Sequence, residues 1–157
     1  MSLQFSPKTE EEILKDLSKI SKRKLNIMLI RMLDTSYEFD YNKIMLLIKA
    51  GANVNTKSPA GMTPLMIACR ACDNTNLIKL LIDVGAKINK STRYEGWTAL
   101  FVAAANGRNN IIRVLIDNGA FINPRTTEGY NLTPLGYAVY KKQFVTAELL
   151  RSYGAKE

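Results

Sequence analysis

The chain has 157 residues, of which 46% are hydrophobic and 23% charged, a composition typical of one folded domain with a substantial core. It has no histidine, which removes the most common general base and zinc ligand, and its two cysteines are too few for a disulfide framework. The formal charge of +8, from 22 basic and 14 acidic residues, favours acidic partners of any kind.

The sequence contains no stretch with the pattern of a secretory leader or a membrane span. Residues 1–8 lack an apolar core, and the most apolar run, residues 25–33, is shorter than a bilayer crossing and includes Arg31. We therefore expect neither secretion nor membrane insertion. The cysteine content predicts a reducing setting, in the cytosol or the nucleus.

A short helix is predicted within residues 1–22. Thr9 and Glu12 have the spacing of a capping box, in which each side chain accepts a hydrogen bond from the backbone N–H of the other residue. Four apolar residues follow at helical spacing: Ile13, Leu14, Leu17 and Ile20. We expect this helix to cover the N-terminal end of a domain formed by residues 23–157. That domain is predicted to begin with one helix over residues 23–33 and a second over residues 40–48.

From residue 51 onward the sequence repeats. The dipeptide Gly-Ala begins at residues 51, 85, 119 and 154, at intervals of 34, 34 and 35 residues. A second marker keeps nearly the same period: Thr63-Pro64-Leu65, Thr98-Ala99-Leu100 and Thr133-Pro134-Leu135. Two markers in register predict that one structural unit is repeated along the chain.

Each marker has a structural role within the unit. Threonine at a helix N-cap accepts a hydrogen bond from the first turn, and proline suits the next position. Glycine after the last turn allows a left-handed C-terminal cap. Between these markers lies an apolar face, for example Leu77, Ile78, Leu81 and Ile82. Each unit is thus predicted to contain two helices and a projecting turn or hairpin, over residues 53–62, 87–97 and 122–132. Counted from the glycine of each Gly-Ala to the next marker threonine, over residues 51–63, 85–98 and 119–133, the second connection is one residue and the third two residues longer than the first.

The pattern resembles the ankyrin repeat, most clearly from Thr63 to Asn89 and from Thr98 to Asn123. The resemblance covers residues 25–155 and implies an all-α solenoid of about four units, including degenerate end units, over residues 23–56, 57–91, 92–125 and 126–157. The histidine usual in this family after Thr-Pro-Leu is replaced by Met66, Phe101 and Gly136. In the last unit, Thr146, Ala147 and Arg151 replace isoleucines of the unit before, and we expect this face to be exposed.

No catalytic, cofactor or metal site is predicted. The sequence has no G-x-G-x-x-G and no G-x-x-x-x-G-K-[ST] motif, so neither dinucleotide nor P-loop phosphate binding has support. Cys69 and Cys72 form a C-x-x-C pair, but the remaining zinc ligands could come only from carboxylates or another chain. Cys69 stands where Ala104 stands in the next unit, which favours a small buried packing residue. We expect no enzyme activity and no small-molecule substrate.

The resemblance implies a protein-binding module. In ankyrin-like proteins the fingers and the first helix of each pair line a concave side where partners dock, and we expect an adaptor or inhibitor that binds an acidic protein surface there. The contacts are expected from these residues: Lys57, Met62, Arg70, Arg93, Tyr94, Trp97, Phe101, Asn106, Tyr130, Leu132, Tyr140 and Lys141. For Trp97 and Phe101 the alternative is packing within the domain.

Other functions stay open at this point. The charge of +8 favours nucleic acid as the rival partner, although the basic residues are spread over fingers and helices. A non-catalytic regulatory subunit of an enzyme is a third possibility. The abundance of lysine, isoleucine and asparagine indicates an AT-rich genome. Small ankyrin proteins of intracellular bacteria and large viruses act on host proteins, so the resemblance also suggests a pathogen or viral protein in the host cytosol.

Overall fold

The computed structural model describes residues 8–35, 39–127 and 131–157. Within these ranges the chain forms nine helices and no strand. The helices are α1 (Glu10–Ser18), α2 (Lys22–Thr35), α3 (Tyr41–Lys49), α4 (Pro64–Ala71), α5 (Thr75–Asp83), α6 (Ala99–Ala105), α7 (Asn109–Asp117), α8 (Pro134–Tyr140) and α9 (Phe144–Ser152).

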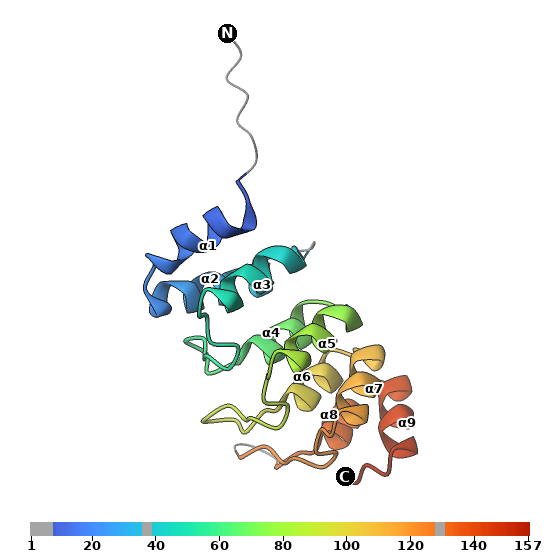
Figure 1. Ribbon diagram of the computed structural model, residues 1–157. Coiled ribbons are helices and arrows are strands. Elements are labelled where there is room, and N and C mark those ends of the chain that lie inside the picture. The colour runs from blue at the N-terminus through green and yellow to red at the C-terminus, as the bar shows by residue number, and fades with distance from the viewer. Residues whose placement is uncertain (1–7, 36–38, 128–130) are drawn as a thin grey trace.

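The helices pair and stack along one direction (Figure 1). The first helices α2, α4, α6 and α8 form one row, in which each contacts the next. The second helices α3, α5, α7 and α9 form the other row, and each packs on the first helix of its own pair. The connections between pairs project to the same side of the stack (Figure 1), and we name them finger 1 (residues 53–62), finger 2 (residues 87–97) and finger 3 (residues 122–132). We call the surface formed by the fingers and the first helices the finger face.

The threonines predicted to start the first helices do so. Thr63, Thr98 and Thr133 are the N-caps of α4, α6 and α8, and each Oγ1 accepts the N–H three residues on at 3.1–3.4 Å. The hydroxyls are buried, so each bond satisfies a helix-end donor that water could not reach. The glycines predicted to end the second helices are also confirmed, with φ between 80° and 105° at residues 51, 85, 119 and 154.

Asparagine side chains link successive units. Asn55 Nδ2 donates to the carbonyl of Gly85 at 2.9 Å, and its Oδ1 accepts from the N–H of Lys87 at 2.8 Å. Asn89 makes the same two bonds one unit later, to Gly119 and Phe121, at 2.9 and 2.8 Å. Because each asparagine satisfies the backbone just after the next second helix, these bonds fix the spacing between units.

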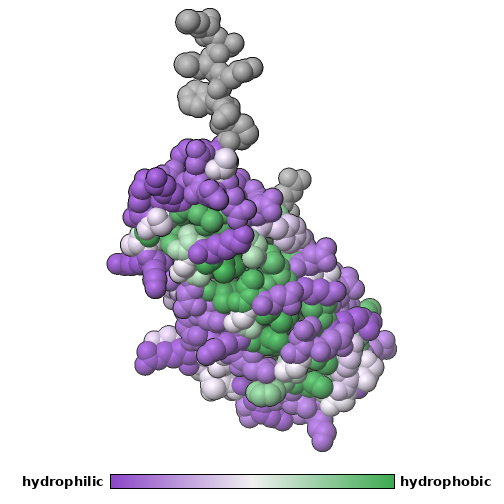
Figure 2. Space-filling view, viewed as in Figure 1, coloured by the Kyte–Doolittle hydropathy of each residue, from purple (hydrophilic) through white to green (hydrophobic). Residues whose placement is uncertain are grey.

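The core is a continuous apolar layer that runs through the stack. It includes the leucines and isoleucines predicted for the second helices, with Leu77, Ile78 and Leu81 of α5 fully buried. Cys69 is also fully buried in this layer, as expected for a small packing residue. Figure 2 shows hydrophilic residues over α1 and the fingers and a band of hydrophobic residues over the helices between them.

The last unit differs from the sequence-based expectation. Thr146 and Ala147 of α9 were expected on an exposed face, but both are buried, and only Arg151 is exposed. Thr146 Oγ1 donates to Asn109 Oδ1 of α7 at 2.8 Å, which allows a hydroxyl to lie in the core. Thr146 and Ala147 therefore lie inside the stack instead of facing solvent.

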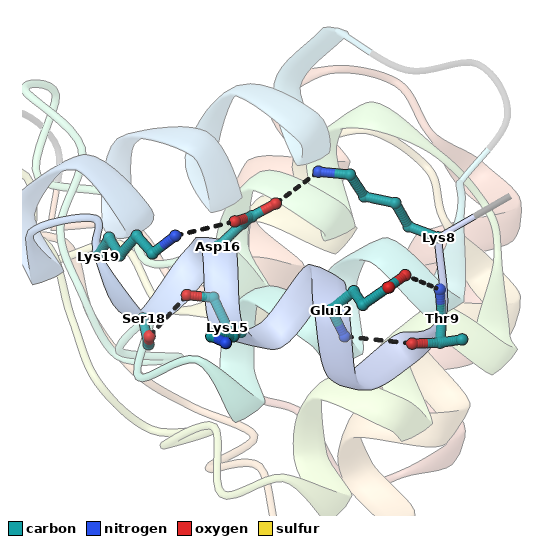
Figure 3. Close-up of polar contacts among 7 residues, drawn as sticks. All are labelled: Lys8, Thr9, Glu12, Lys15, Asp16, Ser18 and Lys19. Carbon is teal, nitrogen blue, oxygen red and sulfur yellow. Dashed lines mark hydrogen bonds and ion pairs between the residues drawn. The ribbon is translucent and has the colours of Figure 1, made fainter. Parts of the chain in front are cut away.

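Helix α1 begins with the predicted capping box (Figure 3). Thr9 Oγ1 accepts from the N–H of Glu12 at 3.3 Å, and Glu12 Oε2 accepts from the N–H of Thr9 at 2.9 Å. The helix lies against α3, where Leu17 packs on the core and Glu10 pairs with Lys49 at 2.6 Å. No residue of α1 is fully buried, so its attachment to the stack is lighter than that of the other helices.

The polar side of α1 carries a small charge cluster (Figure 3). Asp16 pairs with Lys8 at 2.5 Å and with Lys19 at 3.2 Å. The hydrogen bonds from these two ammonium groups, Lys8 first, hold the pKa of the Asp16 carboxyl below its usual value. All three groups are exposed, so the cluster contributes little to the stability of the stack.

Candidate protein-binding surface

The base of each finger is closed by the same two hydrogen bonds. A serine or threonine donates its N–H to the carbonyl of the last finger residue, whose own N–H donates back to the hydroxyl. The pairs are Ser58 with Met62, Thr92 with Trp97 and Thr126 with Leu132, at 2.9–3.2 Å. In the sequence, the segments between these paired residues, 59–61, 93–96 and 127–131, lengthen by one residue from each finger to the next. The predicted lengthening of the fingers therefore lies between the paired residues.

Fingers 2 and 3 are joined near their tips. The N–H of Thr127 donates to the carbonyl of Glu95 at 3.0 Å, and its hydroxyl donates to the carbonyl of Tyr94. Gly96 has φ +72°, and a Cβ there would lie 3.1 Å from the Thr127 nitrogen. A residue with a side chain would thus be strained and would push the two fingers apart. The tip of finger 2 is consequently held in one position.

The exposed tip of finger 2 presents an arginine and a tyrosine together. The Tyr94 side chain is 66% exposed, and the Arg93 guanidinium carbon lies 5.8 Å from the centre of its ring. This distance is within the range of a cation–π contact. Because the backbone carbonyl of Tyr94 is bound by Thr127, the pair is displayed on an ordered loop.

Four aromatic rings form a continuous series from the core to the surface, which we name the aromatic ladder. Its members are Trp97, Phe101, Tyr137 and Tyr140. Trp97 stacks on Phe101 with 5.3 Å between ring centres, Phe101 lies 5.2 Å from Tyr137, and Tyr137 lies 6.2 Å from Tyr140. All three spacings are typical of favourable aromatic pairs.

The ladder crosses from one unit to the next. Trp97 ends finger 2, Phe101 belongs to α6, and the two tyrosines belong to α8. Phe101 is only 1% exposed, Trp97 and Tyr137 are half-buried, and Tyr140 is 64% exposed. The buried ring thus supports the rings that reach the finger face. Large aromatic surface at low conformational cost is what protein interfaces most often use as anchors.

A lysine covers the outer end of the ladder. Lys141 Nζ lies 5.6 Å from the centre of the Tyr137 ring and 5.5 Å from that of Tyr140. The ammonium group is exposed and adds positive charge beside the two tyrosines. This end of the ladder can therefore meet a surface that is both apolar and acidic.

Comparison with known protein families gives a direct match. The model described as ankyrin repeats (3 copies) matches residues 32–126 and again residues 73–157, and together these matches span most of the chain. The chain belongs to the ankyrin-repeat family. Ankyrin repeats generally mediate protein–protein interaction, so the chain carries a module of that kind. No curated protein matches this ankyrin-repeat chain in a sequence comparison.

The predicted contact residues of this ankyrin-repeat protein divide by exposure. Seven are exposed: Lys57, Arg70, Arg93, Tyr94, Asn106, Tyr140 and Lys141. Trp97 and Leu132 are half-buried, and Tyr130 lies outside the described residues. Within the exposed set, Arg70 is held by an ion pair to Asp34 at 2.5 Å. Asn106 is engaged as well, since its Nδ2 donates to the carbonyl of Val102 at 2.8 Å.

Met62 and Phe101 belong to the core instead of the surface. Met62 closes finger 1 against the stack, and its sulfur accepts a weak hydrogen bond from Arg70 at 3.7 Å. Phe101 points into the ladder, where the family's histidine would stand. The contact role expected for these two side chains is corrected accordingly to one of support.

Sequence reasoning missed Tyr137. Its ring contacts three other aromatic rings and links Phe101 to Tyr140, and it also lies beneath Lys141. The available signal was its position three residues before Tyr140 on one helix, since side chains at that spacing share a face.

The two cysteine side chains are free thiols, with Cys69 buried and Cys72 half-buried. Burial raises the pKa of the Cys69 thiol, and burial is also the main cause of the raised pKa of Cys72. Cys72 Sγ donates to the carbonyl of Ala68 at 3.4 Å. Over the described ranges no three metal-ligating side chains gather, and no helix there is long and apolar enough to cross a membrane.

Proposed function

We propose that this ankyrin-repeat chain binds its partner protein through the C-terminal half of the finger face. The observation that carries the proposal is the aromatic ladder, which anchors the exposed Tyr140 ring to the buried Phe101 ring. The Arg93–Tyr94 pair on finger 2 extends the same surface, because finger 2 ends in Trp97. Aromatic and arginine side chains of this kind dominate the energy of many interfaces.

The order of the surface favours tight binding. Finger 2 is tied to finger 3 through Thr127, and the ladder rings pack on one another before any partner arrives. Side chains that are already fixed lose little entropy on association. A partner therefore gains most of the contact energy without first ordering the surface.

We infer that the chain acts as an inhibitor or adaptor, by covering a surface of the partner or by bridging two partners. Occlusion is the simpler mechanism, because it requires only that the finger face occupy a surface that another molecule uses. Action of a pathogen or viral protein on a host target in the cytosol would be one form of such occlusion.

The test is capture of the partner from nuclease-treated lysate, followed by measurement of its dissociation constant. Tyr140→Ala is compared with Phe121→Ala, because the two side chains are 64% and 66% exposed and Phe121 lies outside the ladder. We expect Tyr140→Ala to weaken binding by about 1–2 kcal/mol, roughly five- to thirtyfold. Phe121→Ala should change the dissociation constant by less than about twofold. Equal effects of the two variants would contradict the proposal.

Nucleic acid is the second candidate, and the positive charge of the fingers favours it. The described part of fingers 1 and 2 carries Lys57, Lys87, Lys90 and Arg93 against one carboxylate, Glu95. Retention on DNA or RNA at physiological salt, with a steep loss of affinity as salt rises, would support this candidate. A partner enzyme whose rate changes on binding would instead identify a regulatory subunit.

A further inference from the structure

A groove lies between α2 and finger 1, at the opposite end of the row of first helices from the aromatic ladder. It has a volume of about 760 Å³, which is within the range of binding pockets. Its walls include three cationic and three apolar residues: Arg23, Arg31, Lys57, Ile27, Ile30 and Pro59. Among the described residues that line it, none carries a carboxylate.

The charge around the groove is unbalanced. Helix α2 carries four basic residues and one acidic residue, Asp34, and that carboxylate is engaged by Arg70 at 2.5 Å. Within the described ranges, no ion pair with a carboxylate involves Arg23 or Lys57. Lys57 Nζ donates to the carbonyl of Ser91 at 3.3 Å, which holds the ammonium near finger 2 without neutralising it. The groove therefore presents a positive field to any ligand.

The groove also has an apolar part to its lining. Ile27 is 43% exposed, so a large part of this apolar side chain stays in contact with water. Ile30 is half-buried beside it, and Pro59 at the tip of finger 1 is exposed. Apolar side chains that stay in contact with water gain free energy when a ligand covers them.

We propose that this groove binds an extended acidic segment of the partner protein, with an aliphatic side chain on Ile27 and Ile30 and flanking carboxylates on Arg23 and Lys57. The inference deepens the proposed function and rests on it for the identity of the ligand as a protein. Guanidinium and ammonium groups match carboxylates through charge-assisted hydrogen bonds. The described lining residues offer no aromatic ring on which a base could stack, which favours a peptide over single-stranded nucleic acid.

Three fluorescein-labelled peptides test the chemistry, by fluorescence anisotropy at about 0.15 M ionic strength. One alternates glutamate with leucine, one alternates glutamate with serine, and one alternates lysine with leucine. We expect the glutamate–leucine peptide to bind at least about tenfold more tightly than the glutamate–serine peptide, and the lysine–leucine peptide not to bind. Absence of binding by the glutamate–leucine peptide, or equal binding of all three, would overturn the proposal.

Paired charge reversals then locate the site. Arg23→Glu with Lys57→Glu changes the groove, and Lys79→Glu with Arg113→Glu makes the same charge change on the exposed sides of α5 and α7. We expect the affinity for the glutamate–leucine peptide to fall by at least about tenfold in the groove variant and by less than about threefold in the control variant. Similar losses of affinity in the two variants would show only a long-range attraction to positive charge, and would overturn the assignment of the peptide site to the groove. Circular dichroism confirms that both variants fold.

The two proposals fail in different ways. A captured partner that is lost with Tyr140→Ala but retained by the groove variant would overturn the acidic-segment inference and leave the proposed function standing. The groove could instead bind the glutamate–leucine peptide as expected while Tyr140→Ala leaves the affinity for the captured partner unchanged. That result would contradict only the proposed role of the aromatic ladder.

Discussion

Replacement of Phe101 by alanine removes the buried rung of the aromatic ladder. The ring is 1% exposed and lies 5.3 Å from Trp97 and 5.2 Å from Tyr137, centre to centre. Loss of a core phenylalanine costs about 3–5 kcal/mol, and each aromatic pair adds about 0.5–1.5 kcal/mol beyond its buried area. We therefore expect Phe101→Ala to lower the free energy of unfolding by about 4 kcal/mol, a large part of the total for a domain of this size.

Urea unfolding measures this effect with two probes, circular dichroism and the emission of Trp97, the only tryptophan. Because Trp97 stacks on Phe101, the folded variant should also emit at a longer wavelength than the wild type. Phe121→Ala is the matched control, since that ring is exposed, and it should change stability by less than about 0.5 kcal/mol. A loss below about 1 kcal/mol for Phe101→Ala, or equal losses for both variants, would refute the view that the ladder is anchored in the core.

Three further predictions concern caps, fingers and cysteines. Thr98→Ala should lower the free energy of unfolding by about 1 kcal/mol, because it removes the N-cap acceptor of α6; an unchanged urea midpoint would contradict this role. Gly96→Ala should cost more than about 1 kcal/mol and speed amide exchange in finger 3, since its φ is +72°; wild-type exchange rates would show that the fingers are not coupled. Ellman's reagent at about pH 8 should label Cys72 more slowly than free cysteine, with a rate that still rises above pH 9, because burial raises its thiol pKa and only the thiolate reacts. Cys69 should react only after unfolding, and labelling of the folded protein at both thiols would contradict the described burial.

The parts of the fold that depend on neighbours in sequence could be predicted. Thr9 with Glu12, and Thr98 with Ala99 and Leu100, are local signals, because a cap bonds to the backbone a few residues away. The glycine after each second helix is local for the same reason. The period of these signals then fixed the number and order of helices.

The side-chain environment depends on the next unit and could not be read from one unit alone. Thr146 was expected in solvent because it is polar, but Asn109 of the preceding pair accepts its hydroxyl and buries it. Phe101 was expected to contact a partner because it is aromatic, with packing within the domain as the alternative, and it is buried beside Tyr137 of the following unit. Contacts between units join residues more than thirty positions apart, and the sequence pattern within one unit does not reveal which residues they join.

The candidate surface was predicted in part. The exposed Arg93, Tyr94 and Tyr140 were chosen because their positions are not needed to build a unit, and the structure places them on the finger face. The links that give this surface its order, from Thr127 to finger 2 and from Tyr137 to Phe101, arise only when the units stack. Their use in binding stays a prediction.

In the proposed complex, the partner covers the C-terminal half of the finger face. Hydrogen–deuterium exchange of the chain with and without its captured partner tests this claim most directly, because each amide reports its own protection. We expect added protection in residues 92–97 of finger 2 and residues 137–142 at the end of α8, with α5 and α7 unchanged. Protection confined to α5 and α7, with finger 2 and α8 exchanging as in the free chain, would contradict this claim.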